Sequence, residues 1–162
     1  MIEARFLKVV MVGCLALFAL LVAYNNLIDY GSNYAFVQHV LSMDTTFPGN
    51  ALLDRAITSP TAWTVAYWAI ILAETLTALT FAIGAIAMLH SLRADAIRFQ
   101  RAKRFVYLGA GLGFLVWFFG FMVVAGEWFA MWQSKTWNGQ EAAFRFYLPI
   151  LAVLIFVDQR DD

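Results

Sequence analysis

A single acidic residue, Glu74, lies in the long apolar stretch between Ser59 and Leu89. An ionisable group inside a membrane segment is costly, and it is therefore a candidate for function by default. One interpretation is a site that handles a proton or pairs with a ligand. The other is structural: burial favours the protonated form, and a neutral acid would hydrogen-bond to a neighbouring helix, with Thr77 one turn along sharing that role.

A second group of polar residues lies near the ends of the apolar segments. It contains Glu127 and Arg145 late in the chain, and Asn25, Asn26 and Asp29 at the end of the first apolar segment. Because unpaired polar groups are costly in lipid, we expect a salt bridge and amide hydrogen bonds that close the outer mouth of a helix bundle. A polar pocket for a headgroup or small ligand is the alternative.

Three tryptophans, Trp128, Trp132 and Trp137, follow one another between the last two apolar segments. Tryptophan is enriched where a membrane meets water, so the spacing predicts an interfacial belt. The alternative is an aromatic platform for a quinone, a lipid or a partner helix.

Signatures of enzymes and of metal sites are missing from the sequence. The motifs H-E-x-x-H, C-x-x-C, G-x-x-x-x-G-K-[ST] and G-x-S-x-G do not occur. The two histidines, His39 and His90, fall on opposite sides of the membrane in the topology given below and cannot share one haem. We therefore expect no catalytic residues, no metal, no cofactor and no nucleic acid among the partners.

The elements that must position these residues follow from composition. Of the 162 residues, 62% are hydrophobic and 14% are charged, against roughly 45–50% and 25% in soluble domains. Four apolar segments reach or approach the ~20 residues that cross a bilayer. We expect an all-α membrane protein with one integral-membrane domain, residues 1–162, built as a four-transmembrane-helix bundle. The expected spans are about 5–28, 61–90, 104–131 and 139–157.

The first connection, residues 30–59, is too apolar for a mobile tether. Its spacing predicts short helices before and after the turn around Pro48-Gly49, packed as an ordered outer, periplasmic cap on the bundle. The single cysteine, Cys14, lies inside the first apolar segment, where we expect buried packing.

Small residues mark one face of the third apolar segment. Gly109 and Gly113 form a G-x-x-x-G pair, and Gly120 follows seven residues later. At ~100° per residue Glu127 returns to the same face. Because small residues let helices approach closely, we expect Glu127 to point into the bundle.

The distribution of positive charge predicts the orientation. Eight basic residues lie on the side that holds both ends of the chain and residues 90–104: Arg5, Lys8, Arg93, Arg98, Arg101, Lys103, Arg104 and Arg160. Three lie on the other side: Arg55, Lys135 and Arg145. Because cytoplasmic loops carry an excess of Lys and Arg, we expect both termini in the cytoplasm.

Two runs on the predicted outer side carry a resemblance to a known family. The runs Met43–Asn50 and Gly126–Ser134, followed by Trp137-Asn138-Gly139-Gln140 and Ala142-Ala143-Phe144-Arg145, resemble those of a bacterial family of small integral membrane proteins. The similarity covers nearly the whole chain. The family is catalogued as a domain of unknown function, so the resemblance implies a bacterial inner-membrane location and no activity.

Two functions of different class fit these observations. The first is a non-enzymatic accessory or scaffolding subunit that packs against a larger inner-membrane complex, with the bilayer, a membrane-protein partner or further copies of itself as partners. The second is a protein that binds or transports a lipid, a quinone or a small solute, using Glu74 and the outer polar cluster. A cavity that reaches Glu74 would favour the second, and a solid core would favour the first.

Overall fold

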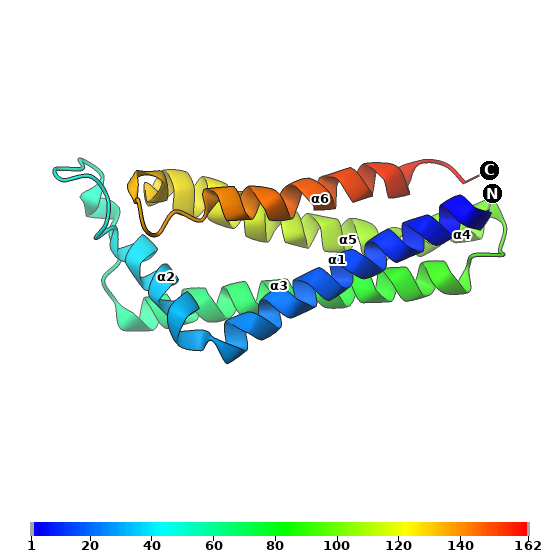
Figure 1. Cartoon of the computed structure of the whole chain (residues 1–162), viewed down its shortest axis with the longest axis horizontal. Helices are drawn as coiled ribbons and strands as arrows, with labels where there is room; N and C mark the ends of the chain where they lie inside the picture. The colour runs from blue at the N-terminus through cyan, green and yellow to red at the C-terminus, as the bar shows by residue number, and fades with distance from the viewer. Residues whose placement is uncertain (1, 162) are drawn as a thin grey trace.

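Four long apolar helices run beside one another along the molecule (Figure 1). The computed structural model describes residues 2–161. Within these residues the secondary structure is helical, without strands, and four helices are long and apolar enough to cross a membrane. The prediction of an all-α, four-span membrane protein is therefore confirmed.

The elements follow one another with short connections. In chain order they are α1 (Ile2–Ile28), α2 (Tyr30–Ser42), the 3₁₀ turn η1 (Leu53–Arg55), α3 (Pro60–His90), α4 (Ala96–Ala102), α5 (Arg104–Phe114), the π-helix η2 (Leu115–Trp128), the 3₁₀ turn η3 (Met131–Gln133) and α6 (Gln140–Asp158). The four candidate spans are α1, α3, the run from α4 to the end of η2, and α6.

The helix α3 begins as its sequence predicts. Ser59 is the N-cap, its hydroxyl accepts a hydrogen bond from the backbone N–H of Ala62, and Pro60 takes the first helical position. From there α3 makes the most extensive contacts of the fold, with α1 on one side and α5 on the other. The other pair, α6 and the α5–η2 run, packs above them in Figure 1.

Large apolar side chains face outward along every span. Leu17, Leu72, Leu108 and Ile155 are all exposed, as expected for surfaces that lipid chains cover. Cys14 lies on such an outward face of α1. Its expected buried packing is wrong, because the buried face of α1 is formed instead by valine, leucine and alanine side chains.

The third span changes its winding at Leu115. Its first part, α5, is an α-helix, but the next 14 residues form a π-helix. At the end of this segment the N–H of Phe129 bonds to the carbonyl of Val124, five residues back, at 3.0 Å. Since π-helices longer than a single turn are rare and π-turns concentrate at functional sites, this segment is the least ordinary element of the fold.

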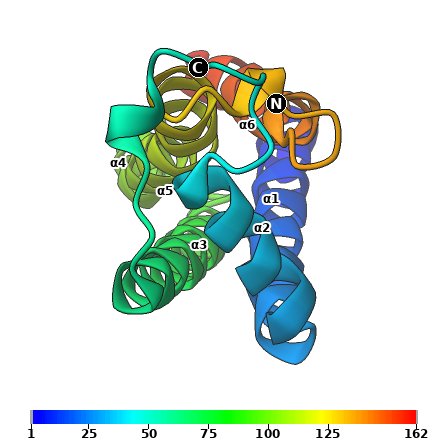
Figure 2. The ribbon, with the colours of Figure 1, turned by 90° about the vertical axis from the view of Figure 1, so that its left-hand side faces the viewer.

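At the end away from the two termini, the two connections form one packed layer, here called the cap (residues 29–59 and 129–139). The hydroxyl of Thr45 donates to that of Ser134 at 2.8 Å, and the side chain of Gln133 accepts from the N–H of Phe47 at 3.0 Å. Figure 2 looks onto this end and shows α2 in the centre, with η1 at the left beside η2.

Candidate functional site

A pocket of about 430 Å³ lies between α3 and η2, beneath α2. Val37 and Val40 of α2 form part of its roof, Ala69 and Ala73 of α3 one wall, and Phe119 of η2 part of the other. Its lining is almost entirely apolar. Ligand pockets typically measure ~300–1,000 Å³ and are mostly apolar, so this space is large enough to hold part of a ligand.

The pocket opens sideways. Leu115 and Phe119, at its edge, are 57% and 52% exposed, and both lie within the third span. An opening at this depth faces the hydrocarbon of the bilayer and not the water. Molecules that enter by this route are therefore the apolar parts of membrane components.

The roof over the pocket depends on the amphipathic character of α2. Val37 and Val40 are buried, and Phe36 and Leu41 pack partly against the same surfaces. The helix ends at Met43, which is 1% exposed and adopts a left-handed backbone with φ 53°. The chain then continues across the cap, so α2 is anchored at its far end.

The intramembrane carboxyl group lies beside the pocket but turns away from it. Glu74 is 1% exposed, and its Oε2 accepts a hydrogen bond of 2.7 Å from the side chain of Asn26 on α1. The carbonyl of Asn26 in turn accepts a 2.7 Å bond from the hydroxyl of Tyr67 on α3. Ala73 lines the pocket and Glu74 does not, because consecutive residues of a helix point about 100° apart. The hydroxyl of Thr77 donates to the carbonyl of Ala73 in its own helix and not to Glu74.

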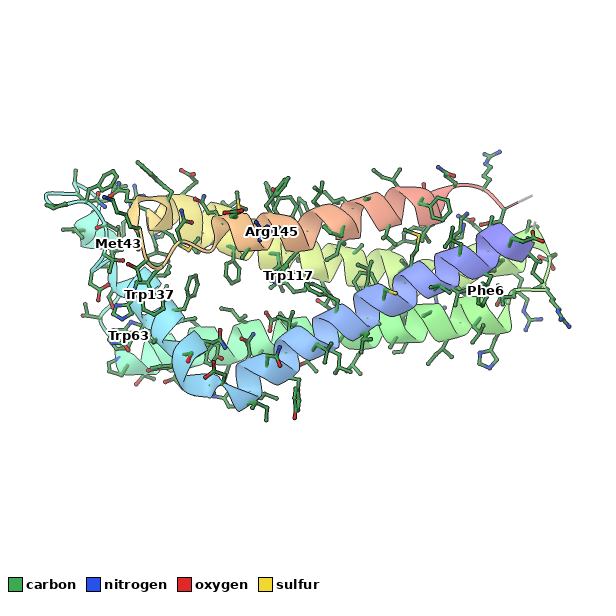
Figure 3. All side chains as sticks on the ribbon, in the orientation of Figure 1. Phe6, Met43, Trp63, Trp117, Trp137 and Arg145 are labelled. Carbon is green, nitrogen blue, oxygen red and sulfur yellow. The ribbon has the colours of Figure 1, made fainter. Side chains whose placement is uncertain are left out.

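The rest of the predicted polar cluster does not assemble. Arg145 pairs with Glu141 on its own helix at 2.5 Å, and both side chains are exposed (Figure 3). Glu127 is exposed as well, so the predicted salt bridge and the inward direction of Glu127 are both wrong. The reason is the π-winding of η2. Its backbone hydrogen bonds join residues five apart and not four, so the spacing of 100° per residue used to place Glu127 does not hold there.

The two other predicted members, Asn25 and Asp29, are exposed near the α1–α2 junction. The N–H of Asp29 bonds to the carbonyl of Asn25 at 2.9 Å, and the side chain of Asn33 donates to the carbonyl of Asp29 at 3.2 Å. These contacts shape a turn. Of the five residues in the predicted outer cluster, Asn26 alone contacts Glu74.

The three tryptophans have three different surroundings at the cap end. Trp137 stacks on His39 with ring centroids 4.7 Å apart, and Figure 3 places it beneath the outermost loop. Trp132 is exposed and meets Phe47 edge to face at 5.7 Å. Trp128 is exposed too, and the guanidinium of Arg55 lies over its ring.

A buried charge cluster at the opposite end was not predicted. Asp161 accepts hydrogen bonds from the ammonium groups of both Lys8, at 2.8 Å, and Lys103. Lys103 is 0% exposed and Asp161 is 7% exposed. Arg5 reinforces the cluster by donating to the Asp161 carbonyl at 3.0 Å and to the Ala94 carbonyl at 2.7 Å. One feature of the sequence could have indicated it, because Lys8 directly precedes an apolar segment. Lys8 and Lys103 entered only the count of basic residues that predicts the orientation.

Two positive charges keep Asp161 ionised. Burial by itself would raise the pKa of its carboxyl group, but hydrogen bonds and charges from Lys103 and Lys8 outweigh burial and lower the pKa below its ordinary value. The cluster joins the C-terminal segment to α1 and to the junction of α4 and α5, so its geometry indicates a structural joint. Among residues 2–161, no group of three or more histidine, cysteine or acidic side chains is arranged to hold a metal ion.

The fold and its lipid-facing surface define the class: a polytopic α-helical integral membrane protein. The sequence profile of the family described as predicted small integral membrane protein (DUF2165) matches residues 4–160, and the chain belongs to that family. The resemblance seen in the sequence is therefore confirmed. Comparisons with curated proteins and with solved structures give no match.

Proposed function

We propose that the protein binds a membrane lipid and holds one of its apolar chains in the pocket between α3 and η2. The observation that carries this proposal is the pocket itself: about 430 Å³, apolar, roofed by α2 and open toward the bilayer. Lipid and quinone tails are the apolar molecules that reach such an opening by diffusion in the membrane.

The π-helix gives the proposal independent support. Phe119, Gly120 and Val124 all lie in η2 and line the pocket. A regular α-helix over the same residues would present a different set of side chains to α3. Because π-turns are costly and are retained mainly at functional sites, the coincidence of the rare winding with the pocket wall favours a binding role.

The test is to fill the pocket. Ala69→Phe adds an aromatic ring to the α3 wall, whereas Ala152→Phe adds the same ring to an outward position of α6 and serves as the control. We expect native mass spectrometry of the gently purified protein to show a bound lipid in the parent and in Ala152→Phe, and several-fold less in Ala69→Phe. Equal lipid occupancy in all three proteins would refute the proposal.

The accessory-subunit role is the second candidate, and one observation supports it. Phe47 and Trp132 are 49% and 48% exposed on the cap, which lies beyond the four spans. Exposed aromatic pairs of this kind are typical of protein contacts. Proteins that copurify with the parent but not with a Phe47→Ser, Trp132→Ser double variant would support a partner at this surface.

We also propose that the membrane is a bacterial inner membrane, with the termini in the cytoplasm and the cap in the periplasm. The support is the count of eight basic residues against three. The termini and α4 lie at one end of the molecule and the cap at the other (Figure 1), the arrangement that the count assumes.

A further inference from the structure

The chemistry of the bound lipid is decided outside the apolar pocket, at the cap end of its η2 wall. A lipid tail that moves from the bilayer into an apolar pocket exchanges one hydrocarbon surface for another, so the hydrophobic effect provides no driving force. Preference for one lipid over another must then come from the polar group that emerges beside the cap.

A cation lies at this cap end of η2, although neither its side chain nor the ring beneath it lines the pocket. Arg55, in η1, donates a 3.2 Å hydrogen bond to the carbonyl of Trp128, and its guanidinium carbon lies 4.4 Å from the centroid of the Trp128 ring. Phe129, the next residue, lines the pocket. In Figure 2, η1 lies at the left beside η2, and the chain runs from it down to α3; side chains of η2 and α3 form the pocket walls.

The segment that carries Arg55 is held firmly. Leu52 and Ala56, on either side of η1, pack against the buried cluster that contains Phe129. The N–H of Ile57 bonds to the carbonyl of Leu41, at the end of α2, at 2.8 Å. Arg55 is therefore fixed relative to both the roof and the wall of the pocket.

The guanidinium retains free binding capacity. It has five N–H donors, and within residues 2–161 its only side-chain hydrogen bond is the one to Trp128. Asp54, next to Arg55 in the chain, and Glu127, next to Trp128, are exposed, and neither forms an ion pair with Arg55 in the described structure. The N–H donors of a planar guanidinium, here held on an aromatic face, have the spacing to bind two oxygens of one phosphate.

We propose that the ligand is a phospholipid, with its phosphate bound by Arg55 over Trp128 and one acyl chain in the pocket between α3 and η2. This inference rests on the proposed lipid-binding function and selects, among lipids and quinones, the class that carries a phosphate.

The test compares two lipids that differ only in the headgroup. Purified parent protein is offered an equimolar mixture of phosphatidylglycerol and diacylglycerol with identical acyl chains, and the bound lipid is read by native mass spectrometry. We expect about a tenfold preference for phosphatidylglycerol, because a hydrogen bond to a charged group is worth roughly an order of magnitude in affinity. Arg55→Gln should bind both lipids about equally, and Arg55→Lys should retain part of the preference.

Lys135→Gln is the matched control, since it removes another exposed cation from the cap and should leave the preference unchanged. Equal binding of the two lipids by the parent, or an undiminished preference in a folded Arg55→Gln variant, would overturn the phosphate assignment. Because the parent's own preference needs no variant, the test holds even if Arg55→Gln folds poorly. Equal binding of the two lipids, with Ala69→Phe reducing both, would leave the pocket function intact while the phosphate assignment fails. Lipid binding that Ala69→Phe does not reduce would refute the pocket function itself.

Discussion

At the scale of single residues, Glu74 and Tyr67 hold Asn26 at two points. The Glu74 carboxyl group accepts from the Asn26 side chain, and the Tyr67 hydroxyl donates to the Asn26 carbonyl, each at 2.7 Å. Both partners belong to α3, while Asn26 lies near the end of α1, four residues before α2 begins. The buried acid therefore helps to fix the direction in which α2 leaves α1 and covers the pocket.

This arrangement predicts different effects for two substitutions. Glu74→Gln keeps a side-chain oxygen that can accept from Asn26, so its melting temperature in detergent should match the parent's. Glu74→Leu removes the acceptor and should lower the free energy of unfolding by the ~0.6–2 kcal/mol typical of hydrogen bonds between membrane helices. Thr75→Val is the control, because the Thr75 hydroxyl donates only within its own helix, to the Ile71 carbonyl. A stable Glu74→Gln variant that reproduces the phenotype of deleting the gene would show that ionisation matters and that the hydrogen bond is not the whole role.

The burial of Glu74 and its hydrogen bond to a neighbouring helix could be predicted from its isolation in an apolar segment, but its partner could not. Asn26 was one of five candidate polar residues near the segment ends, and the choice among them depends on the relative rotation of α1 and α3, which sequence spacing within one helix does not encode. The interaction of Lys8 and Lys103 with Asp161 was missed for the same reason. Each of these pairs joins different elements.

At the scale of elements, the glycine pair of α5 lies at two close helix contacts. A Cβ atom added to Gly109 would lie 2.9 Å from the side chains of Thr80 and Phe81 on α3. One added to Gly113 would lie 2.7 Å from Ile150 on α6. The two glycines therefore let α5 pack against both neighbours.

Gly113→Leu should consequently destabilise the bundle. Overpacking typically costs ~1–3 kcal/mol, and we expect a clearly lower melting temperature in detergent. Gly111→Leu is a strict control, because a Cβ atom at Gly111 meets nothing within 4 Å. If the two variants melted together, the proposed contact between α5 and α6 would be wrong.

The number of spans followed from hydropathy, since each span needs a run of about 20 apolar residues to cross the bilayer. The π-helix did not follow, because no residue type marks this winding as glycine marks a turn. The hydrophobic residues of Leu115–Trp128 fit an α-helix equally well. The α-helical spacing therefore held for Gly109 and Gly113, which precede η2, and failed for Glu127, which lies within it.

At the scale of the whole molecule, the two ends differ in charge and in construction. One end holds the termini, α4 and the buried lysines, and the other holds the cap with its exposed aromatic residues (Figures 1 and 3). The asymmetry predicts which end faces the cytoplasm.

Cysteine labelling checks this orientation. In a Cys14→Ala background, which removes the chain's one native cysteine, Thr136→Cys reports on the cap and Ala96→Cys on the α3–α4 connection, and neither changes the charge. A membrane-impermeant maleimide added to cells whose outer membrane has been permeabilised should label Thr136→Cys at once and Ala96→Cys only after lysis. The reverse pattern would invert the topology.

The Lys8–Asp161–Lys103 cluster also imposes an order on biosynthesis. Asp161 follows Lys103 by 58 positions and Lys8 by 153, so the ribosome adds the acid long after both bases. Until then, two ammonium groups destined for a closed interior have no counter-charge and must stay hydrated at the membrane surface. This end of the bundle can close only when the segment after α6 arrives. A chain interrupted before that point would carry four inserted helices with both ammonium groups still unpaired at this end.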